Sequence, residues 1–161
     1  MNDVTKFINP MTLTELWFKE AVPQPTAKNL TVQLGVHLEE VTELIEALLP
    51  NLSPALVTKA DDAIEALSKL AMSLKTAPVQ DYVNADFRNN AEALDAVVDQ
   101  AVTLIGIAYM SSWDIQNALN EVNRSNWSKF DENHKPVFNS DGKIMKGKLY
   151  TPPVLTPFLK K

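Results

Sequence analysis

The sequence contains no cysteine, which excludes disulfides and thiolate metal sites. Histidine occurs only at His37 and His134, and no Glu-x-x-His pair is present, which argues against a ferritin-like di-iron site. Glycine is also scarce, at 4 residues against 10 prolines, and this balance predicts helices bounded by proline rather than a sheet with many turns. A metal site in this chain would therefore rely on oxygen ligands.

Two further absences concern basic charge and long hydrophobic runs. The formal net charge is −5 and the pI is near 5.0, so the chain lacks the basic surface that general nucleic-acid or anionic-membrane binding needs. The longest apolar run, AVTLIGIAYM at residues 101–110, is shorter than the roughly 18 residues that span a bilayer, and the opening MNDVTKFINP is too polar for a secretory signal. We therefore expect a cytoplasmic protein that binds neither nucleic acid nor a membrane.

The 161 residues, of which 45% are hydrophobic, suit one folded domain. Apolar residues at steps of three and four, together with proline boundaries, predict helices over about residues 12–21, 27–49, 55–76, 90–110 and 112–130. Asp141-Gly142 predicts a short β-hairpin. The expected fold is an all-α bundle of about four to five helices, with an N-terminal arm or helix at 1–25, a helical core at 27–130, and a hairpin and extended tail at 131–161.

The helix predicted at residues 90–110 has an unusually wide apolar stripe, which leaves little polar face. Its members are Leu94, Val97, Val98, Ala101, Leu104, Ile105 and Ala108. We expect this to be the most buried helix of the protein.

The segment HLEEVTELIEAL, residues 37–48, carries Glu39, Glu40 and Glu43, and residues 29–58 contain neither Lys nor Arg. In a helix, Glu40 and Glu43 lie about 60° apart and Glu39 and Glu43 about 40° apart, so the three carboxylates share one face. Such a face is either simply solvated or binds a cation.

A second acidic pair, Asp95 and Asp99, lies within the apolar segment LDAVVDQAVTLIG, and residues 89–123 lack Lys and Arg. Ionised carboxylates in apolar surroundings are costly unless they are paired or coordinated. Two acidic helices without basic residues indicate a shared cation, and oxygen ligands select Mg²⁺, with Mn²⁺ as the alternative.

Basic and amide side chains cluster near the end of the last predicted helix, at Asn123, Arg124, Asn126 and Lys129. Such donors suit a polyphosphate. The alternative is a helix end whose basic residues complement the helix dipole. Carboxylates for a metal and donors for phosphate together indicate a metal-assisted phosphoanhydride hydrolase.

These residues resemble a known family. The motif Glu39-Glu40-x-x-Glu43, followed by acidic residues in DAVVDQAVTLIGIAY, resembles the all-α nucleoside triphosphate pyrophosphohydrolases, which include MazG, dimeric dUTPases, dCTPases and phosphoribosyl-ATP pyrophosphohydrolases. The segment EVNRSNWSKFDENHKPVFNSDGKIMKGKLYTPP is similar to the C-terminal part of MazG-like proteins of phages and mobile elements. The resemblance covers most of the chain from about residue 30.

The resemblance implies that Glu40 and Glu43 are Mg²⁺ ligands and that Glu39 orients or deprotonates the attacking water. The second family motif is ExxD, and here Ala96 stands three residues before Asp99, so that Asp95 would have to substitute. A different register would use Glu92 with Asp95. We prefer Asp95 with Asp99, because both lie deeper in the apolar segment.

The resemblance also implies that the nucleotide contacts Asn123, Asn126 and Lys129, and more weakly Arg124. A (d)NTP would be cleaved to a (d)NMP and pyrophosphate, and the chain would form a homodimer or homotetramer. The alternatives are a catalytically silent module that binds a nucleotide or a partner protein, which the Ala96 departure favours, and a purely structural helical bundle.

Overall fold

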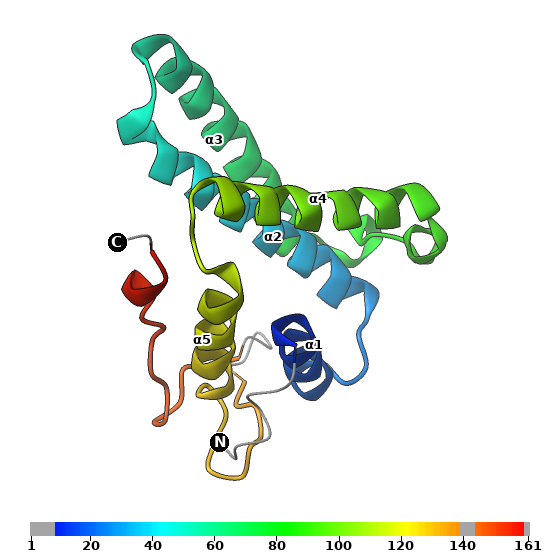
Figure 1. The fold of residues 1–161 in the computed structure, drawn as a ribbon. Helices are drawn as coiled ribbons and strands as arrows, with labels where there is room; N and C mark the ends of the chain where they lie inside the picture. The colour runs from blue at the N-terminus through cyan, green and yellow to red at the C-terminus, as the bar shows by residue number, and fades with distance from the viewer. Residues whose placement is uncertain (1–8, 139–143, 160–161) are drawn as a thin grey trace. The chain divides into compact units, whose positions relative to one another are not determined.

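The computed structural model describes residues 9–138 and 144–159. This part of the chain contains five α-helices, α1 Pro10–Ala21, α2 Ala27–Leu48, α3 Pro54–Lys75, α4 Ala91–Met110 and α5 Ile115–Trp127 (Figure 1). Four short 3-10 helices accompany them, η2 Leu49–Asn51, η3 Val79–Asp81, η4 Ala85–Asn89 and η5 Thr156–Phe158. The predicted all-α class and the helix positions are confirmed.

Polar caps and prolines set where the first helices begin. Asn9 caps α1 by accepting a hydrogen bond from the Met11 amide at 2.9 Å, with Pro10 at the first helical position. Thr26 and Asn29 form a reciprocal capping box at the start of α2. α3 begins at Pro54, as the sequence predicts, although the side chain of Ser53 makes no capping hydrogen bond.

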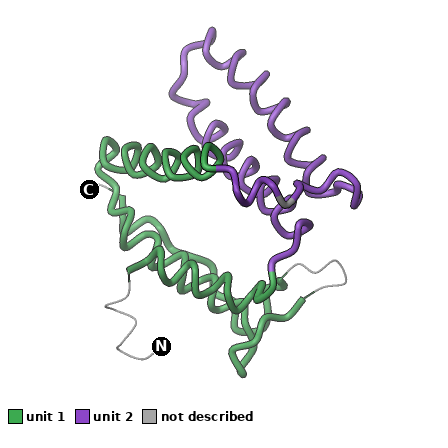
Figure 2. The backbone as a smooth tube through the Cα atoms, turned by 90° about the vertical axis from the view of Figure 1, so that its right-hand side faces the viewer, with its two compact units in different colours: residues 1–24, 91–161 green, residues 25–90 purple. Residues whose placement is uncertain are grey.

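The chain divides into two compact units, residues 25–90 and residues 1–24 with 91–161 (Figure 2). We call these the hairpin unit and the terminal unit. This division cuts the expected helical core, residues 27–130, between Asn90 and Ala91.

The hairpin unit consists of α2 and α3, packed side by side (Figure 1), and the segment that follows them. Their approach is close at Gly35, where a Cβ atom would lie 2.7 Å from the Ala71 carbonyl oxygen. The fully buried Thr31 accepts a hydrogen bond from the Val83 amide at 2.9 Å. This bond ties the segment after α3 back to α2.

The terminal unit is centred on the packing of α1 against α5. Phe130, which is 1% exposed, stacks on Trp17 with ring centroids 6.0 Å apart and meets the Trp127 ring edge-on at 5.2 Å. The buried Asn123 amide donates to the Pro10 carbonyl oxygen at 2.9 Å and its Oδ1 accepts from the Thr14 hydroxyl at 2.9 Å. Polar and aromatic contacts therefore fix α1 on α5.

The prediction that α4 is the most buried helix is wrong within the terminal unit. Ala108 is its one buried residue, and its large apolar side chains are exposed. Within the terminal unit, α5 contacts α1 far more extensively than it contacts α4. A wide apolar stripe shows that a helix favours a packing partner, but it does not show that the same chain supplies one.

The β-hairpin expected near the C-terminus is present only as an antiparallel bridge between Phe138 and Ile144, and the described residues contain no strand. The Met145 amide donates to the Val137 carbonyl oxygen at 2.7 Å beside this bridge. The predicted turn at Asp141-Gly142 lies outside the described residues.

Candidate functional site

The acidic motif lies on α2, where helical spacing sets Glu40 and Glu43 one turn apart. Both side chains are exposed, and neither has an ion-pair or hydrogen-bond partner among the residues that the structure describes. Two unpaired carboxylates at this spacing can ligate a divalent cation through oxygen atoms.

Glu39 differs from its two neighbours, because Lys75 of α3 forms an ion pair with it through Oε1. The Glu39 side chain is 39% exposed and that of Lys75 is 27% exposed. This contact was not predicted from the sequence, since Lys75 lies outside the stretch around α2 that lacks Lys and Arg. Two consecutive helices of equal length, 22 residues each, are expected to pair as an α-helical hairpin. That expectation would have pointed to a contact between Lys75 and α2.

The second acidic pair, Asp95 and Asp99, lies on α4 in the terminal unit. Both residues are exposed and make no ion pair within residues 9–138 and 144–159, whereas Glu92, in the first turn of α4, does have a contact. Within the terminal unit, the apolar surroundings that the sequence predicts for this pair are absent, so burial in this unit does not require a cation here. Among the described residues, no group of three or more Asp, Glu or His side chains is placed to hold a metal ion.

Among the residues expected to bind the nucleotide, the Asn123 side chain forms the hydrogen bonds between α1 and α5 described above. Asn126 is partly exposed, and its Oδ1 accepts a hydrogen bond from Lys129 Nζ at 2.8 Å. The Asn126 carbonyl oxygen also accepts from Trp17 Nε1 at 3.0 Å, and Lys129 Nζ lies 5.7 Å from the centroid of the Trp17 ring. Asn126 and Lys129 therefore lie together, beside an aromatic ring, and remain partly accessible.

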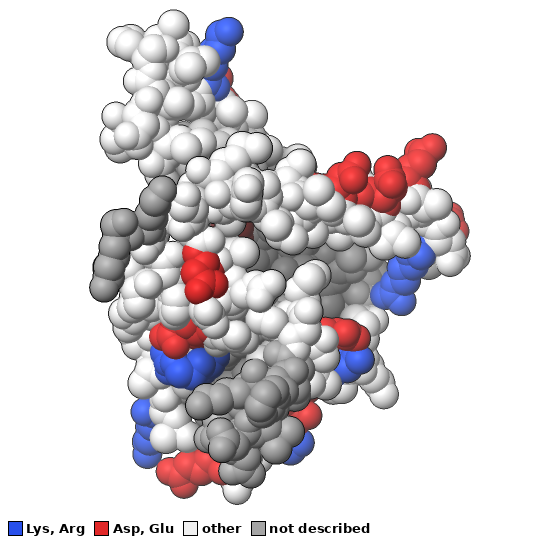
Figure 3. Space-filling model, in the orientation of Figure 1, with Lys and Arg blue, Asp and Glu red and all other residues white. Residues whose placement is uncertain are grey.

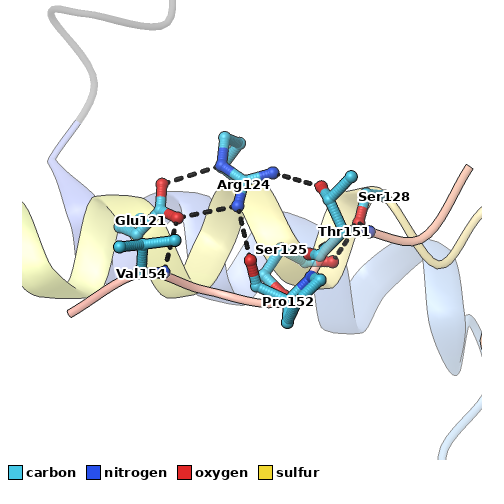
Figure 4. Close-up of polar contacts among 7 residues, drawn as sticks. All are labelled: Glu121, Arg124, Ser125, Ser128, Thr151, Pro152 and Val154. Carbon is cyan, nitrogen blue, oxygen red and sulfur yellow. Dashed lines mark hydrogen bonds and ion pairs between the residues drawn. The ribbon is translucent and has the colours of Figure 1, made fainter.

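Arg124 holds the C-terminal tail on α5 (Figure 4). Its Nε and Nη2 each donate to the Glu121 carboxylate at 2.7 Å, and Nη2 also donates to the Pro152 carbonyl oxygen at 3.0 Å. A further bond joins Nη1 to the Thr151 hydroxyl. The Val154 amide also donates a hydrogen bond to the Glu121 carboxylate at 2.9 Å. We call this set of hydrogen bonds from Glu121 and Arg124 to the tail the clasp. A phosphate that binds Arg124 would have to displace these partners.

The clasp determines how Glu121 titrates. The hydrogen bonds from Arg124, and then from the Val154 amide, lower the pKa of Glu121 from its ordinary value of 4.5 to about 2. Sequence reasoning missed this role, although Glu121 and Arg124 have the i,i+3 spacing typical of helical ion pairs.

We expect the clasp to give a specific acid dependence of stability. Because the folded pKa is depressed, the Glu121 carboxylate contributes stability that is present above pH 4.5 and is lost as the pH falls towards 2. The free energy of unfolding of the native protein should therefore fall more steeply across this window than that of Glu121→Gln, as measured by denaturant titration at several pH values. Parallel profiles for the two proteins would show that the clasp does not stabilise the fold.

Comparison with family models, curated proteins and solved structures finds no match to this chain.

Proposed function

We propose that the protein is a Mg²⁺-dependent nucleoside triphosphate pyrophosphohydrolase, which cleaves a (d)NTP to a (d)NMP and pyrophosphate. The observation that carries this proposal is the exposed carboxylate pair Glu40 and Glu43 on α2, which has no cationic partner among the described residues, beside the ion-paired Glu39. The resemblance of this motif to that of the pyrophosphohydrolases supplies the reaction.

In this proposal, Glu40 and Glu43 of α2 would hold the metal ion. Bound Mg²⁺ would neutralise triphosphate charge and stabilise the pyrophosphate leaving group. Glu39 would accept a proton from the water whose oxygen bonds to phosphorus, while the anhydride bond between the α- and β-phosphates breaks and pyrophosphate leaves. Lys75 is a positioning residue in this scheme, because its ammonium group fixes the Glu39 carboxylate on the surface of α2. The family resemblance implies that Asn126 and Lys129, which lie together in the terminal unit, would supply donors for the nucleotide.

The direct test is pyrophosphate release from a panel of NTPs and dNTPs with Mg²⁺. We expect Glu40→Gln and Glu43→Gln each to lower kcat/KM at least about 100-fold, because each removes a ligand of the proposed metal ion. Glu46→Gln is the matched control, since this exposed glutamate lies on the same helix outside the motif and should retain activity. Full activity in Glu43→Gln, or an equal loss in Glu46→Gln, would contradict the site assignment.

A second candidate is a catalytically silent module that binds a nucleotide or a partner protein. Two observations favour it, Ala96 at the motif position three residues before Asp99 and the ion pair that occupies Glu39. Under this alternative, millimolar Mg²⁺ with nucleotide raises the Tm by mass action, while no nucleotide in the panel yields pyrophosphate.

A further inference from the structure

Within the terminal unit, the surface of α4 is apolar and largely unpartnered. Eight large apolar side chains on it are each at least 50% exposed, and one of these, Met110, is the last residue of the helix. The other seven we call the α4 apolar surface: Leu94, Val97, Val98, Val102, Leu104, Ile105 and Tyr109. At about 100° per residue they cover an arc of roughly 160° along the full length of the helix. In Figure 3 the surface over α4 is almost free of charge, apart from acidic side chains towards the N-terminal end of the helix.

The exposed area is large enough to form the centre of a protein–protein interface. Burial of a large apolar side chain removes about 60–120 Å² of apolar surface from water, so seven that are roughly 60% exposed present about 400 Å² per chain. Two such surfaces with a polar rim correspond to about 1,200 Å² in total, which is the lower limit of specific interfaces. The largest apolar patch on a typical monomeric protein covers about 300–600 Å² and is often functional.

The charges of α4 determine which orientation of two such helices is favourable. Its three acidic residues, Glu92, Asp95 and Asp99, all lie in its N-terminal half, and the helix contains no Lys or Arg. Parallel pairing of two copies would bring six carboxylates together. Antiparallel pairing sets the acidic half of each helix beside the uncharged half of the other and opposes the two helix dipoles.

We propose that the α4 apolar surface binds the same surface of a second copy of this chain, with the two helices antiparallel about a two-fold axis near Val102. This register brings Leu94 against the partner's Tyr109 and Val98 against the partner's Ile105. The interface is isologous, so each contact occurs twice. The family resemblance implies only some homo-oligomer, whereas the exposed side chains and charges of α4 assign the surface and the orientation.

A lipid bilayer is the competing partner for this helix. Ala91–Met110 is long and apolar enough to cross a membrane by length and composition. However, Asp95 and Asp99 lie within it, and an aspartate near the centre of a membrane-spanning helix costs about 2.5–3.5 kcal/mol. The α4 charges therefore favour a second copy of the chain over a membrane.

The first test uses the absence of native cysteine, so that introduced thiols report only on the designed positions. We expect Val102→Cys to form a disulfide-linked dimer under mild oxidation. Leu94→Cys and Tyr109→Cys should cross-link efficiently only when the two variants are mixed. Met72→Cys, on α3 with a parent side chain of similar exposure, 55% against 61% for Val102, measures the rate of chance collisions. Self-cross-linking of Leu94→Cys would indicate parallel pairing, and rates no higher than those of Met72→Cys would overturn the proposal.

The second test is the mass in solution by sedimentation equilibrium. The native chain should sediment as two copies, and Val98→Lys should weaken the dimer about 30-fold or more. Leu70→Lys on α3 is the control, because its parent side chain is 51% exposed against 52% for Val98. Circular dichroism verifies that each variant retains its helices. A native monomer at 100 μM, an undiminished dimer in Val98→Lys, or flotation of the chain with phosphatidylglycerol-containing vesicles would contradict pairing through α4. Pyrophosphate release is measured separately, so failure of the dimer and failure of the proposed hydrolase are distinguishable.

Discussion

Truncation of Phe130 to alanine is expected to lower the free energy of unfolding of the terminal unit by about 3–5 kcal/mol. The ring is 1% exposed and contacts both Trp17 and Trp127, so its removal leaves a cavity and two unsupported aromatic faces. Because α1 is held on α5 largely through this cluster, we expect the two helices to separate on milder denaturation than in the native chain.

The measurement is tryptophan fluorescence during guanidinium unfolding. All three tryptophans, Trp17, Trp113 and Trp127, lie in the terminal unit, so the signal reports that unit alone. Phe18→Ala is a suitable control, because the Phe18 ring also contacts Trp17, at 5.1 Å, but is 39% exposed. Its loss should cost markedly less than that of Phe130. Equal effects of the two substitutions would show that the aromatic cluster is not the core of the unit.

The two helical glycines are expected to respond to alanine with opposite signs. A Cβ at Gly35 would lie 2.7 Å from the Ala71 carbonyl oxygen and 2.8 Å from Lys75 Cγ, so the hairpin must open to admit it. Overpacking of this kind costs about 1–3 kcal/mol, which exceeds the gain of about 0.5–1 kcal/mol from higher helix propensity. At Gly106 a Cβ would meet no atom within 4 Å, so only the gain remains.

Far-UV circular dichroism during urea unfolding measures both changes, because the hairpin unit contains no tryptophan. We expect Gly35→Ala to lower the free energy of unfolding by about 1–2 kcal/mol and Gly106→Ala to raise it by about 0.5–1 kcal/mol. A fully stable Gly35→Ala protein would mean that α2 and α3 are not as closely packed at this point as the structure shows.

Much of the secondary structure could be predicted from the sequence, because helix position depends on local signals. Apolar residues at steps of three and four and the proline at Pro54 were sufficient to place the helices. The burial of α4 could not be predicted in the same way. Its apolar stripe reports a preference for a partner, and local periodicity does not identify which chain provides that partner.

In the candidate site too, the features set by local helix geometry could be predicted from the sequence, whereas the contacts between distant residues could not. The spacing of Glu40 and Glu43 on one exposed face follows from helix geometry alone. In contrast, the pairing of Glu39 with Lys75 spans 36 residues, and the contact of Asn123 with Pro10 spans 113. Such contacts depend on how the helices pack, which the spacing of acidic and amide residues does not specify.

The most direct measurement of the central proposal is the binding of a divalent cation by the α2 carboxylates. Mn²⁺ binding, followed by the loss of the free-ion electron paramagnetic resonance signal, can be compared between the native chain, Glu43→Gln and the control Glu46→Gln. We expect the native chain and Glu46→Gln to bind Mn²⁺ equally and Glu43→Gln to bind it at least about 10-fold more weakly. If the native chain fails to bind Mn²⁺, or if Glu43→Gln binds it as tightly as Glu46→Gln does, the proposed metal-dependent chemistry is wrong.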